Sequence, residues 1–337
     1  MDAIADTVFQ GTKSKTQEIE DTPSLLTVVV DTSIHSWVQL TKQQSGSGSE
    51  GSSGEKQLIE ALKSIVVFLN AHLAFNSGNQ VCLIAAHSEG MKYLYPSADS
   101  KPSMSMVSSD MYRGFRNVDE IVVEQWYRLF KEELEGQESK VSMKSSLSGA
   151  MSSALTYVNR ILKENENTSL RSRLLVITCG TSQGKDEIFQ YIPIMNCIFS
   201  ATKMKCSIDV VKIGGSIEST FLQQATDATS GVYLHVENTR GLIQYLSTAM
   251  FIDPSLRNVI IKPNQGSVDF RTSCFLTGKV VAVGFVCSVC LCVLSVIPPG
   301  QKCPACDSPF DSKIIARLRR KPVLSNGVPK KKNVSNK

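Results

Sequence analysis

Four cysteines near the C-terminal end of the chain have the spacing of a metal site. Cys287 and Cys290 form one Cys-x2-Cys pair, and Cys303 and Cys306 form a second pair after 12 intervening residues. Two such pairs can fold toward each other so that four thiolates surround one Zn2+ tetrahedrally. A closed site of this kind is structural, and its metal supplies much of the folding free energy of a small domain. We therefore predict one structural Zn2+ at these four cysteines.

Alternative roles for the cysteine pairs fit the sequence less well. Buried reduced thiols are one alternative. A redox Cys-x2-Cys pair would normally open a helix in a thioredoxin-like unit, and no such pattern is visible. A RING domain needs eight ligands, whereas a single quartet is present. We predict that Cys274 and Cys292 are packing residues, with Cys292 pointing to the opposite side of a strand from the ligands.

A second candidate site follows the apolar segment 25–31, which reads LLTVVVD. A continuous apolar segment of this length is typical of a strand that is buried on both faces of a parallel sheet. Ligands of open α/β sheets gather at the carboxyl ends of the strands. Asp31 and Ser33 could therefore form a metal corner. If Asp31 binds no metal, its role is structural, and it forms hydrogen bonds with the turn that follows its strand.

The chain falls into two predicted domains. Apolar β-branched segments alternate with amphipathic segments, which is typical of a doubly wound α/β fold with a mainly parallel sheet. Strands are predicted at 25–31, 80–87, 91–95, 174–178, 208–213 and 232–236, and helices at 58–73, 118–135, 147–164, 185–205, 219–229 and 241–251. The predicted parts are a flexible N-terminus (1–21), an α/β domain (22–253) with a disordered Ser/Gly loop (43–54) and an irregular insertion (97–117), a four-cysteine zinc-finger domain (254–312) and a basic tail (313–337).

The positive charge of the chain is concentrated at its end. The net charge is +5, and residues 313–337 hold nine Lys or Arg and no acidic residue, so residues 1–312 carry 5 − 9 = −4. Such a tail can contact phosphate backbones non-specifically or serve as a nuclear import signal, and a solvated end is the alternative. It has no interleaved aromatic residues, so stacking on single-stranded bases is not expected.

The composition also bears on compartment and catalysis. Ten Cys without an N-terminal secretory pattern favour a reducing compartment. The uncharged segment 280–297 is nearly long enough to span a bilayer, but it is interrupted by Gly and Cys, and we predict short strands around a buried metal and no membrane partner. We find no GxSxG, GxxxxGK or HExxH motif, and the four His are scattered. These features count against an enzyme.

The strand ending in Asp31-x-Ser33, followed by β/α alternation, resembles a von Willebrand factor A (vWA) domain. That family holds a divalent ion through three oxygen ligands after its first strand, a Thr from a later loop and an Asp after a central strand. Here His35 stands at the third oxygen position, and Cys179 replaces the Asp. Mg2+ needs octahedral oxygen geometry with one or two carboxylates. We therefore expect the Asp31/Ser33 site to be degenerate and to hold no stable Mg2+.

A more specific resemblance runs across residues 22–322. The stretches 68–81, 191–206, 208–215 and 267–278, with the two cysteine pairs, resemble the family of vWA/four-cysteine zinc-finger core subunits of the general transcription and DNA repair factor IIH (TFIIH), in its fungal form. The resemblance implies a nuclear, non-catalytic scaffold in the complex that opens DNA at promoters and at lesions in nucleotide excision repair. It implies stable contact with the RING- and vWA-bearing TFIIH core subunit, which regulates the XPD-type helicase, and with other core subunits.

Two other functions remain open at this point. The first is a metal-dependent vWA ligand binder, in which Asp31 and Ser33 present Mg2+ to an acidic partner. The second is a direct nucleic-acid binder that uses the zinc finger and the basic tail. The sequence does not identify which surface meets which partner.

Overall fold

The structure is a computed structural model of the 337-residue chain, and it divides into two compact units, Met1–Phe270 and Arg271–Lys337. It describes residues 22–34, 36–38, 40, 54–97, 112–135, 146–166, 169–179, 185–215, 219–254, 256–258, 260, 268, 270–272, 274–277, 281–311, 313 and 315–316. The predicted flexible N-terminus (1–21), most of the Ser/Gly loop (43–54) and nearly all of the basic tail (313–337) lie outside the described residues.

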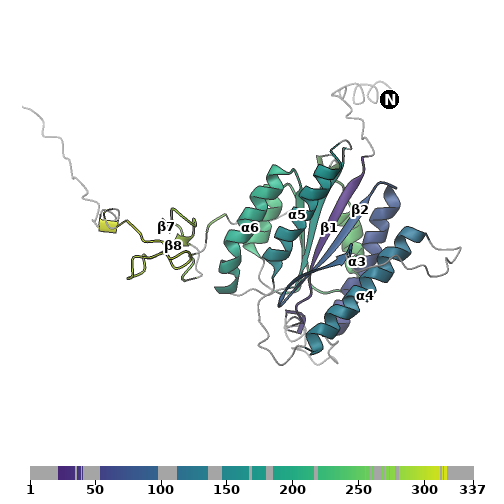
Figure 1. Cartoon of the computed structure of the whole chain (residues 1–337), viewed down its shortest axis with the longest axis horizontal. Helices are drawn as coiled ribbons and strands as arrows, with labels where there is room; N and C mark the ends of the chain where they lie inside the picture. Colours follow the sequence, from purple (N-terminus) through teal and green to yellow (C-terminus); the bar gives the residue numbers. More distant parts are fainter. Residues whose placement is uncertain are drawn as a thin grey trace, which may run out of the picture. The chain divides into compact units, whose positions relative to one another are not determined.

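A six-stranded sheet forms the centre of the first unit (Figure 1). Its strands lie in the order β3-β2-β1-β4-β5-β6, and every neighbouring pair is parallel except β2 and β3. The mainly parallel α/β architecture predicted from the alternation of segments is therefore confirmed. The strands are β1 (Ser24–Asp31), β2 (Gln80–His87), β3 (Gly90–Tyr95), β4 (Arg171–Thr178), β5 (Ser207–Ile213) and β6 (Tyr233–Val236).

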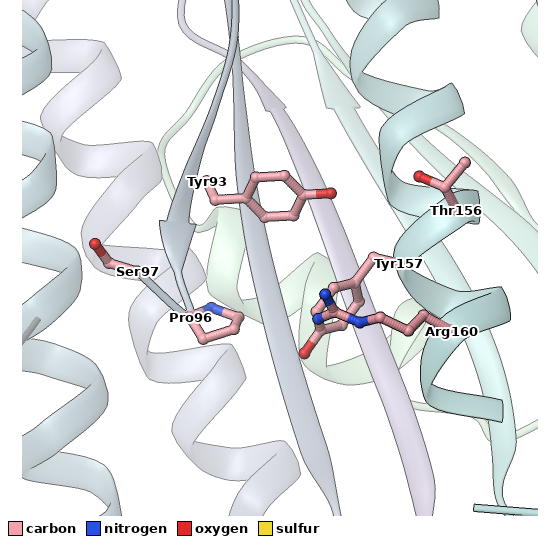
Figure 2. A pocket seen from close by; sticks show the side chains of 6 residues that line it. All are labelled: Tyr93, Pro96, Ser97, Thr156, Tyr157 and Arg160. Atoms are coloured by element: carbon pink, nitrogen blue, oxygen red, sulfur yellow. The ribbon is translucent and has the colours of Figure 1, made fainter. Parts of the chain in front are cut away.

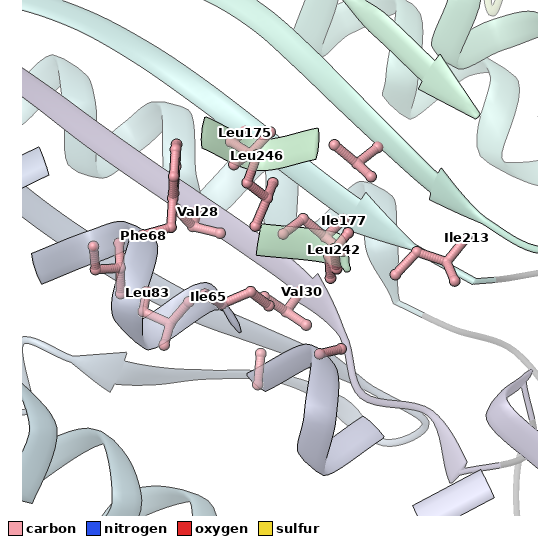
Figure 3. Close-up of a cluster of buried hydrophobic side chains, with 14 of the residues drawn as sticks. Val28, Val30, Ile65, Phe68, Leu83, Leu175, Ile177, Ile213, Leu242 and Leu246 are labelled. Carbon is pink, nitrogen blue, oxygen red and sulfur yellow. The ribbon is translucent and has the colours of Figure 1, made fainter. Parts of the chain in front are cut away.

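The central strand β1 is buried on both faces, as its continuous apolar sequence predicts. Residues 25–31 are all buried. Successive side chains of a strand point to opposite faces. Val28 and Val30 accordingly join one hydrophobic cluster, whereas Leu25 and Val29 join the other. Figure 3 shows the first cluster, in which side chains of β1, β2 and β4 meet those of the covering helices.

Helices cover both faces of the sheet. One face is covered by α3 (Gly54–Phe75), α4 (Arg113–Glu135), α8 (Leu242–Tyr245) and the π-helical turn η1 (Leu246–Met250), and the other by α5 (Leu147–Glu164), α6 (Lys185–Lys203) and α7 (Thr220–Ala228). The predicted helix at 147–164 has the same bounds as α5. Helix α4 begins at Arg113, so the end of the predicted insertion (97–117) is helical.

The segment after the sheet remains attached to the first unit, although the sequence suggested a boundary at Asp253. The reason is a buried ion pair. Arg257, in the 3-10 turn η2 (Leu256–Asn258), donates from Nη2 to Asp209 Oδ2 on β5 at 2.6 Å, and both side chains are at most 3% exposed. The first unit ends at Phe270, so the described residues within 254–270, which the sequence analysis assigned to the zinc-finger domain, group with the α/β unit.

The described residues of the second unit form little regular structure. Its two short antiparallel strands are β7 (Phe285–Val286) and β8 (Val293–Leu294), within the uncharged segment 280–297. That segment has no helix among its described residues. In the described part of the chain, one helix is apolar and long enough to cross a membrane, Lys56–Phe75 within α3. Its Ile65, Phe68 and Leu69 are buried against the sheet, as in the core helix of an α/β domain.

Candidate metal centre

The four cysteines of the predicted quartet lie together in the second unit. The Sγ atoms of Cys287, Cys290, Cys303 and Cys306 are all within 4.8 Å of one another. The distance is 3.7 Å from Cys287 to Cys306 and 3.5 Å from Cys290 to Cys303. Four sulfurs at about 2.3 Å from a tetrahedral Zn2+ would be about 3.8 Å apart. The observed spacing is therefore close to what one Zn2+ requires, and among the described residues no other group of metal-ligating side chains comes together this way.

Two equivalent turns hold the sulfurs in place. We call residues 287–292 the first knuckle and residues 303–308 the second knuckle. The amide of the fifth residue in each knuckle donates to the carbonyl of the first, at 3.0 Å for Leu291 and 2.9 Å for Asp307. Both of these residues have a left-handed backbone, with φ of 60° and 55°. In each knuckle the amide of the first residue also donates to the carbonyl of the sixth, at 3.0 and 2.9 Å. The two knuckles thus repeat the same backbone hydrogen bonds.

The first cysteine of each knuckle is prepared to lose its proton. Burial opposes ionisation of Cys287, but the backbone amides of Cys290 and Val289 and the hydroxyl of Ser308 outweigh burial and lower its pKa to about 6. The pKa of Cys303 is lowered in the same way, against burial, by hydrogen bonds from the second knuckle's backbone and from Cys292. A thiolate is the form that binds metal. Burial raises the pKa of Cys290 to about 11, so a bound cation would have to displace its proton, and four sulfur donors suit a thiophilic cation.

The expectation for Cys292 was wrong. Its Sγ atom lies 3.3 Å from Cys303 Sγ, so it faces the cluster and does not point away from it. The alternation of a strand fails here because Leu291 has a left-handed backbone and residues 288–290 form a turn. Cys274 is fully buried outside the set of four, and its sulfur accepts hydrogen bonds from Ser295 N and Oγ, both at 3.1 Å.

A signal for the position of Cys292 was present in the sequence. The first knuckle reads C-x2-C-x-C and the second reads C-x2-C-x-S, so Cys292 and Ser308 occupy the same place in the repeat. Sequence reasoning counted ligands by the Cys-x2-Cys pairs alone and therefore missed both residues. With four thiolates filling a tetrahedral shell, no coordination position would be left for a substrate. Chemically, the quartet can hold a metal and fix the fold of the second unit.

The second candidate, the Asp31 corner, lies at the carboxyl edge of the sheet. Asp31 is 1% exposed, and its Oδ1 accepts from the amide of Ser33 at 3.1 Å. Its Oδ2 accepts from Thr178 Oγ1 at 3.3 Å, across β1 and β4. The carboxylate therefore closes its own turn, as the structural alternative predicted. Ser33 Oγ, in contrast, is buried without a hydrogen-bond partner.

The position after the central strand β4 holds Cys179. This thiol is fully buried, and burial raises its pKa well above the usual value, with a further increase from the charge of Asp31. Lys212 of β5 lies beside Thr178 in the sheet register and is 3% exposed. Its charge acts on Cys179 in the opposite direction. This edge thus combines one carboxylate, one neutral thiol and one buried ammonium group.

A pocket of about 540 Å³ opens beside the edge strand β3 (Figure 2). Tyr93 of β3 and Tyr157 of α5 have ring centroids 6.1 Å apart, and the Arg160 guanidinium lies 5.1 Å from the Tyr157 ring. Burial raises the pKa of Tyr157 to about 12, so its hydroxyl stays neutral at ordinary pH. The pocket offers aromatic faces and one cation, but no nucleophile beside a base. Its lining residues are Tyr93, Pro96, Ser97, Thr156, Tyr157 and Arg160.

Comparison with known proteins gives a consistent result. A family model described as transcription factor Tfb4 matches residues 23–307. The chain is 64% identical to the general transcription and DNA repair factor IIH subunit TFB4 of Eremothecium gossypii, over 98% of each chain. It is 61% identical to the Saccharomyces cerevisiae protein of the same name, over 98% of this chain and 99% of that one.

A solved structure agrees with the fold. The N-terminal domain of TFIIH p34 is 29% identical, with a TM-score of 0.51, and the match covers 68% of this chain and 98% of that chain. The predicted vWA-like α/β fold with a C-terminal cluster of four cysteines is confirmed. The resemblance noted in the sequence is also confirmed by matches over nearly the whole chain. The chain therefore belongs to the transcription factor Tfb4 family.

Proposed function

We propose that this chain is a structural subunit of the TFIIH core in the nucleus, where it supports transcription initiation by RNA polymerase II and nucleotide excision repair through protein contacts. The names of its relatives support membership of TFIIH. The observation that carries the proposal is the closed cysteine quartet, whose first knuckle bears solvent-exposed apolar side chains. We further propose that Cys287, Cys290, Cys303 and Cys306 bind one structural Zn2+.

A non-catalytic role agrees with the state of the thiols in the α/β unit. Nucleophilic cysteines are partly exposed and have a depressed pKa. Here burial raises the pKa of Cys197 to about 11 and that of Cys206 to about 12, and the pKa of Cys179 is raised well above its usual range. These buried thiols are packing groups at neutral pH. The Zn2+, once bound, would supply folding free energy and would not activate water, because its four sulfur ligands complete the shell.

The exposed face of the first knuckle fits a protein partner. Val289 and Leu291 of the first knuckle are 68% and 67% exposed, and Val286, directly before it, is 59% exposed. Clustered exposed apolar groups mark interaction surfaces. Within 281–311 the only charged residues are Lys302, Asp307 and Asp311, so these described residues alone form no positive patch for phosphates. We propose that this apolar surface contacts a TFIIH core subunit, with the RING- and vWA-bearing subunit as the first candidate.

Two variants at equivalent positions of the knuckles test this contact. Val289→Asp should weaken co-purification with the RING- and vWA-bearing subunit by 10-fold or more, because it places a charge in the proposed apolar interface. Ala305→Asp, at the matching exposed position of the second knuckle, should have little effect. Both variants should keep one zinc per chain, measured by mass spectrometry of the metal. Normal assembly of Val289→Asp, or equal losses in both variants, would argue against this surface.

The cysteine quartet has its own test. Cys303→Ser removes one ligand, so the full-length protein should lose its zinc and expose the second unit to proteolysis. The α/β unit should keep its helical circular dichroism, because its core is separate. Retention of one equivalent of zinc by Cys303→Ser would show that the quartet is not the binding site.

A metal-dependent ligand binder is the second candidate, and one observation favours it. The buried Ser33 Oγ without a partner is the kind of group a bound cation would satisfy. Against it, the buried ammonium of Lys212 puts positive charge at the same edge, and Asp31 already has two hydrogen-bond donors. We propose that no stable Mg2+ binds here. Partner binding that is lost in both EDTA and Asp31→Ala would contradict us and support the metal-dependent function.

Contact between the basic tail and nucleic acid is the third possibility. Binding through phosphates predicts a slope of about −0.9 in log K against log salt for each neutralised phosphate. The nine basic residues of 313–337 would carry that binding. If deletion of 313–337 leaves both the DNA affinity and its dependence on salt unchanged, the tail does not bind DNA.

A further inference from the structure

The sixth residue of each knuckle lies against the metal-ligating sulfurs. In the first knuckle this residue is Cys292, and in the second it is Ser308. Each knuckle therefore places a side chain with one S–H or O–H proton beside the cluster. The backbone repeat makes this a consequence of the fold, since the carbonyl of each sixth residue accepts from the amide of its own first cysteine, at 3.0 and 2.9 Å.

The contacts of the two residues mirror each other. Ser308 Oγ lies 2.9 Å from Cys306 Sγ in its own knuckle and 3.5 Å from Cys287 Sγ in the other. Cys292 Sγ lies 3.3 Å from Cys303 Sγ in the other knuckle. Each sixth residue thus contacts the first cysteine of the opposite knuckle.

We propose that Cys292 and Ser308 are hydrogen-bond donors that hold the thiolates of the quartet from opposite sides and slow the loss of the metal. The inference rests on the proposed Zn2+ site. A cysteine that binds metal must be deprotonated. The proton shared between Cys292 and Cys303 therefore resides on Cys292, and Ser308 likewise donates and does not accept.

Charge gives the physical reason for this arrangement. Four thiolates around one divalent cation leave a net charge of −2 on the site. Hydrogen bonds to thiolates from charge-neutral donors spread that charge, in the same way that partners outside the ligand shell tune other metal sites. Removing such partners typically weakens metal binding by about 10–100-fold. The first knuckle supplies a thiol for this purpose and the second supplies a hydroxyl.

Geometry separates a donor from a fifth ligand. Cys292 does not belong to the set of sulfurs that are mutually within 4.8 Å. Its 3.3 Å distance to Cys303 is also shorter than the 3.5 and 3.7 Å that separate Cys290 from Cys303 and Cys287 from Cys306 within the quartet. Two directly bonded ligands would repel each other at that distance, whereas a thiol proton between them makes it favourable.

The experiment uses the full-length protein loaded with one equivalent of Co2+ or Zn2+. Absorption of the Co2+ form reports the number of sulfur ligands, and transfer of Zn2+ to a chromogenic chelator reports the rate of metal loss. Cys292→Ala and Ser308→Ala should each release zinc about 10-fold faster or more, with the four-sulfur Co2+ spectrum unchanged. Cys292→Ser keeps a donor and should stay within about 3-fold of the parent protein. Ser288→Ala removes an exposed hydroxyl of the first knuckle and is the matched control.

Three results would overturn the inference. One is release at the parental rate by both alanine variants. Another is a loss of about one quarter of the sulfur-to-cobalt charge-transfer intensity in Cys292→Ala, which would make Cys292 a ligand. A third is equally fast release by Cys292→Ser and Cys292→Ala. If Cys292→Ala fails to fold, Ser308→Ala and Cys292→Ser still decide the question. A parent protein that binds no metal would instead refute the proposed zinc site.

Discussion

Removal of the Arg257 guanidinium should strongly destabilise the α/β unit. Its three nitrogens all have partners: Nη2 donates to Asp209 Oδ2 at 2.6 Å, Nη1 to the Ser230 carbonyl at 3.2 Å and Nε to the Ile252 carbonyl at 3.3 Å. In Arg257→Met the apolar stem remains, but Asp209 is left as a buried carboxylate that is 1% exposed. Asp209 Oδ1 still accepts from the amide of Val232, at 2.9 Å.

The expected loss of unfolding free energy follows from removing one partner of a buried ion pair. Leaving an uncompensated buried charge typically costs about 3–5 kcal/mol. A second buried cation, Arg173, interacts favourably with Asp209 and reduces the loss, so we expect the lower end of that range. For a domain of this size, each kcal/mol lowers Tm by about 2–4 °C. A loss of about 3 kcal/mol therefore corresponds to a Tm about 6–12 °C lower.

The assay is urea and thermal unfolding of the full-length protein followed by circular dichroism, which reports mainly on the helical α/β unit. Arg128→Ala is the matched control. Arg128 forms an ion pair with Glu124 at the same 2.6 Å, but the two side chains are 48% and 55% exposed. Exposed pairs of this kind contribute about 0.5 kcal/mol or less. If Arg257→Met costs less than about 1 kcal/mol, or no more than Arg128→Ala, the argument from burial is refuted.

Two further predictions concern the same unit. Gly231→Ala should lower the free energy of unfolding by about 3 kcal/mol, because the new Cβ would collide with the Ile208 carbonyl oxygen. The Cβ of Gly149→Ala meets no atom within 4 Å, so this variant should stabilise α5 by about 0.5–1 kcal/mol. Unfolding midpoints in urea measure both effects, and equal stability of the two variants would contradict the prediction. Burial, followed by the charge of Arg173, lowers the pKa of His72 from 6.5 to about 4. The unfolded state therefore binds a proton at a higher pH than the folded state does, and the free energy of unfolding should fall by about 3 kcal/mol as the pH drops from 6.5 to 4. Stability measured against pH in His72→Gln should lack this loss, and an unchanged pH profile would show that His72 is not responsible.

The sequence was sufficient to predict the α/β fold. Apart from the closing Asp31, every residue of the segment 25–31 is apolar or β-branched, which predicts a central strand, and the structure buries it on both faces. Helix α5 was predicted with its full bounds because its apolar residues recur with helical period. The Cys-x2-Cys spacing likewise predicted that the four sulfurs lie together, because residues three apart in a tight turn can face one point. The structure places them within 4.8 Å of one another.

The order of the strands and the surroundings of the sites depended on the tertiary structure. Local patterns do not show that Arg257 reaches Asp209, 48 residues away, or that the first unit extends to Phe270. Alternation along a strand predicted that Cys292 faces away from the cluster, but a left-handed residue at Leu291 reverses it. Periodicity fixes which face of an element is apolar, whereas long-range pairing and single backbone angles decide which side chains finally meet.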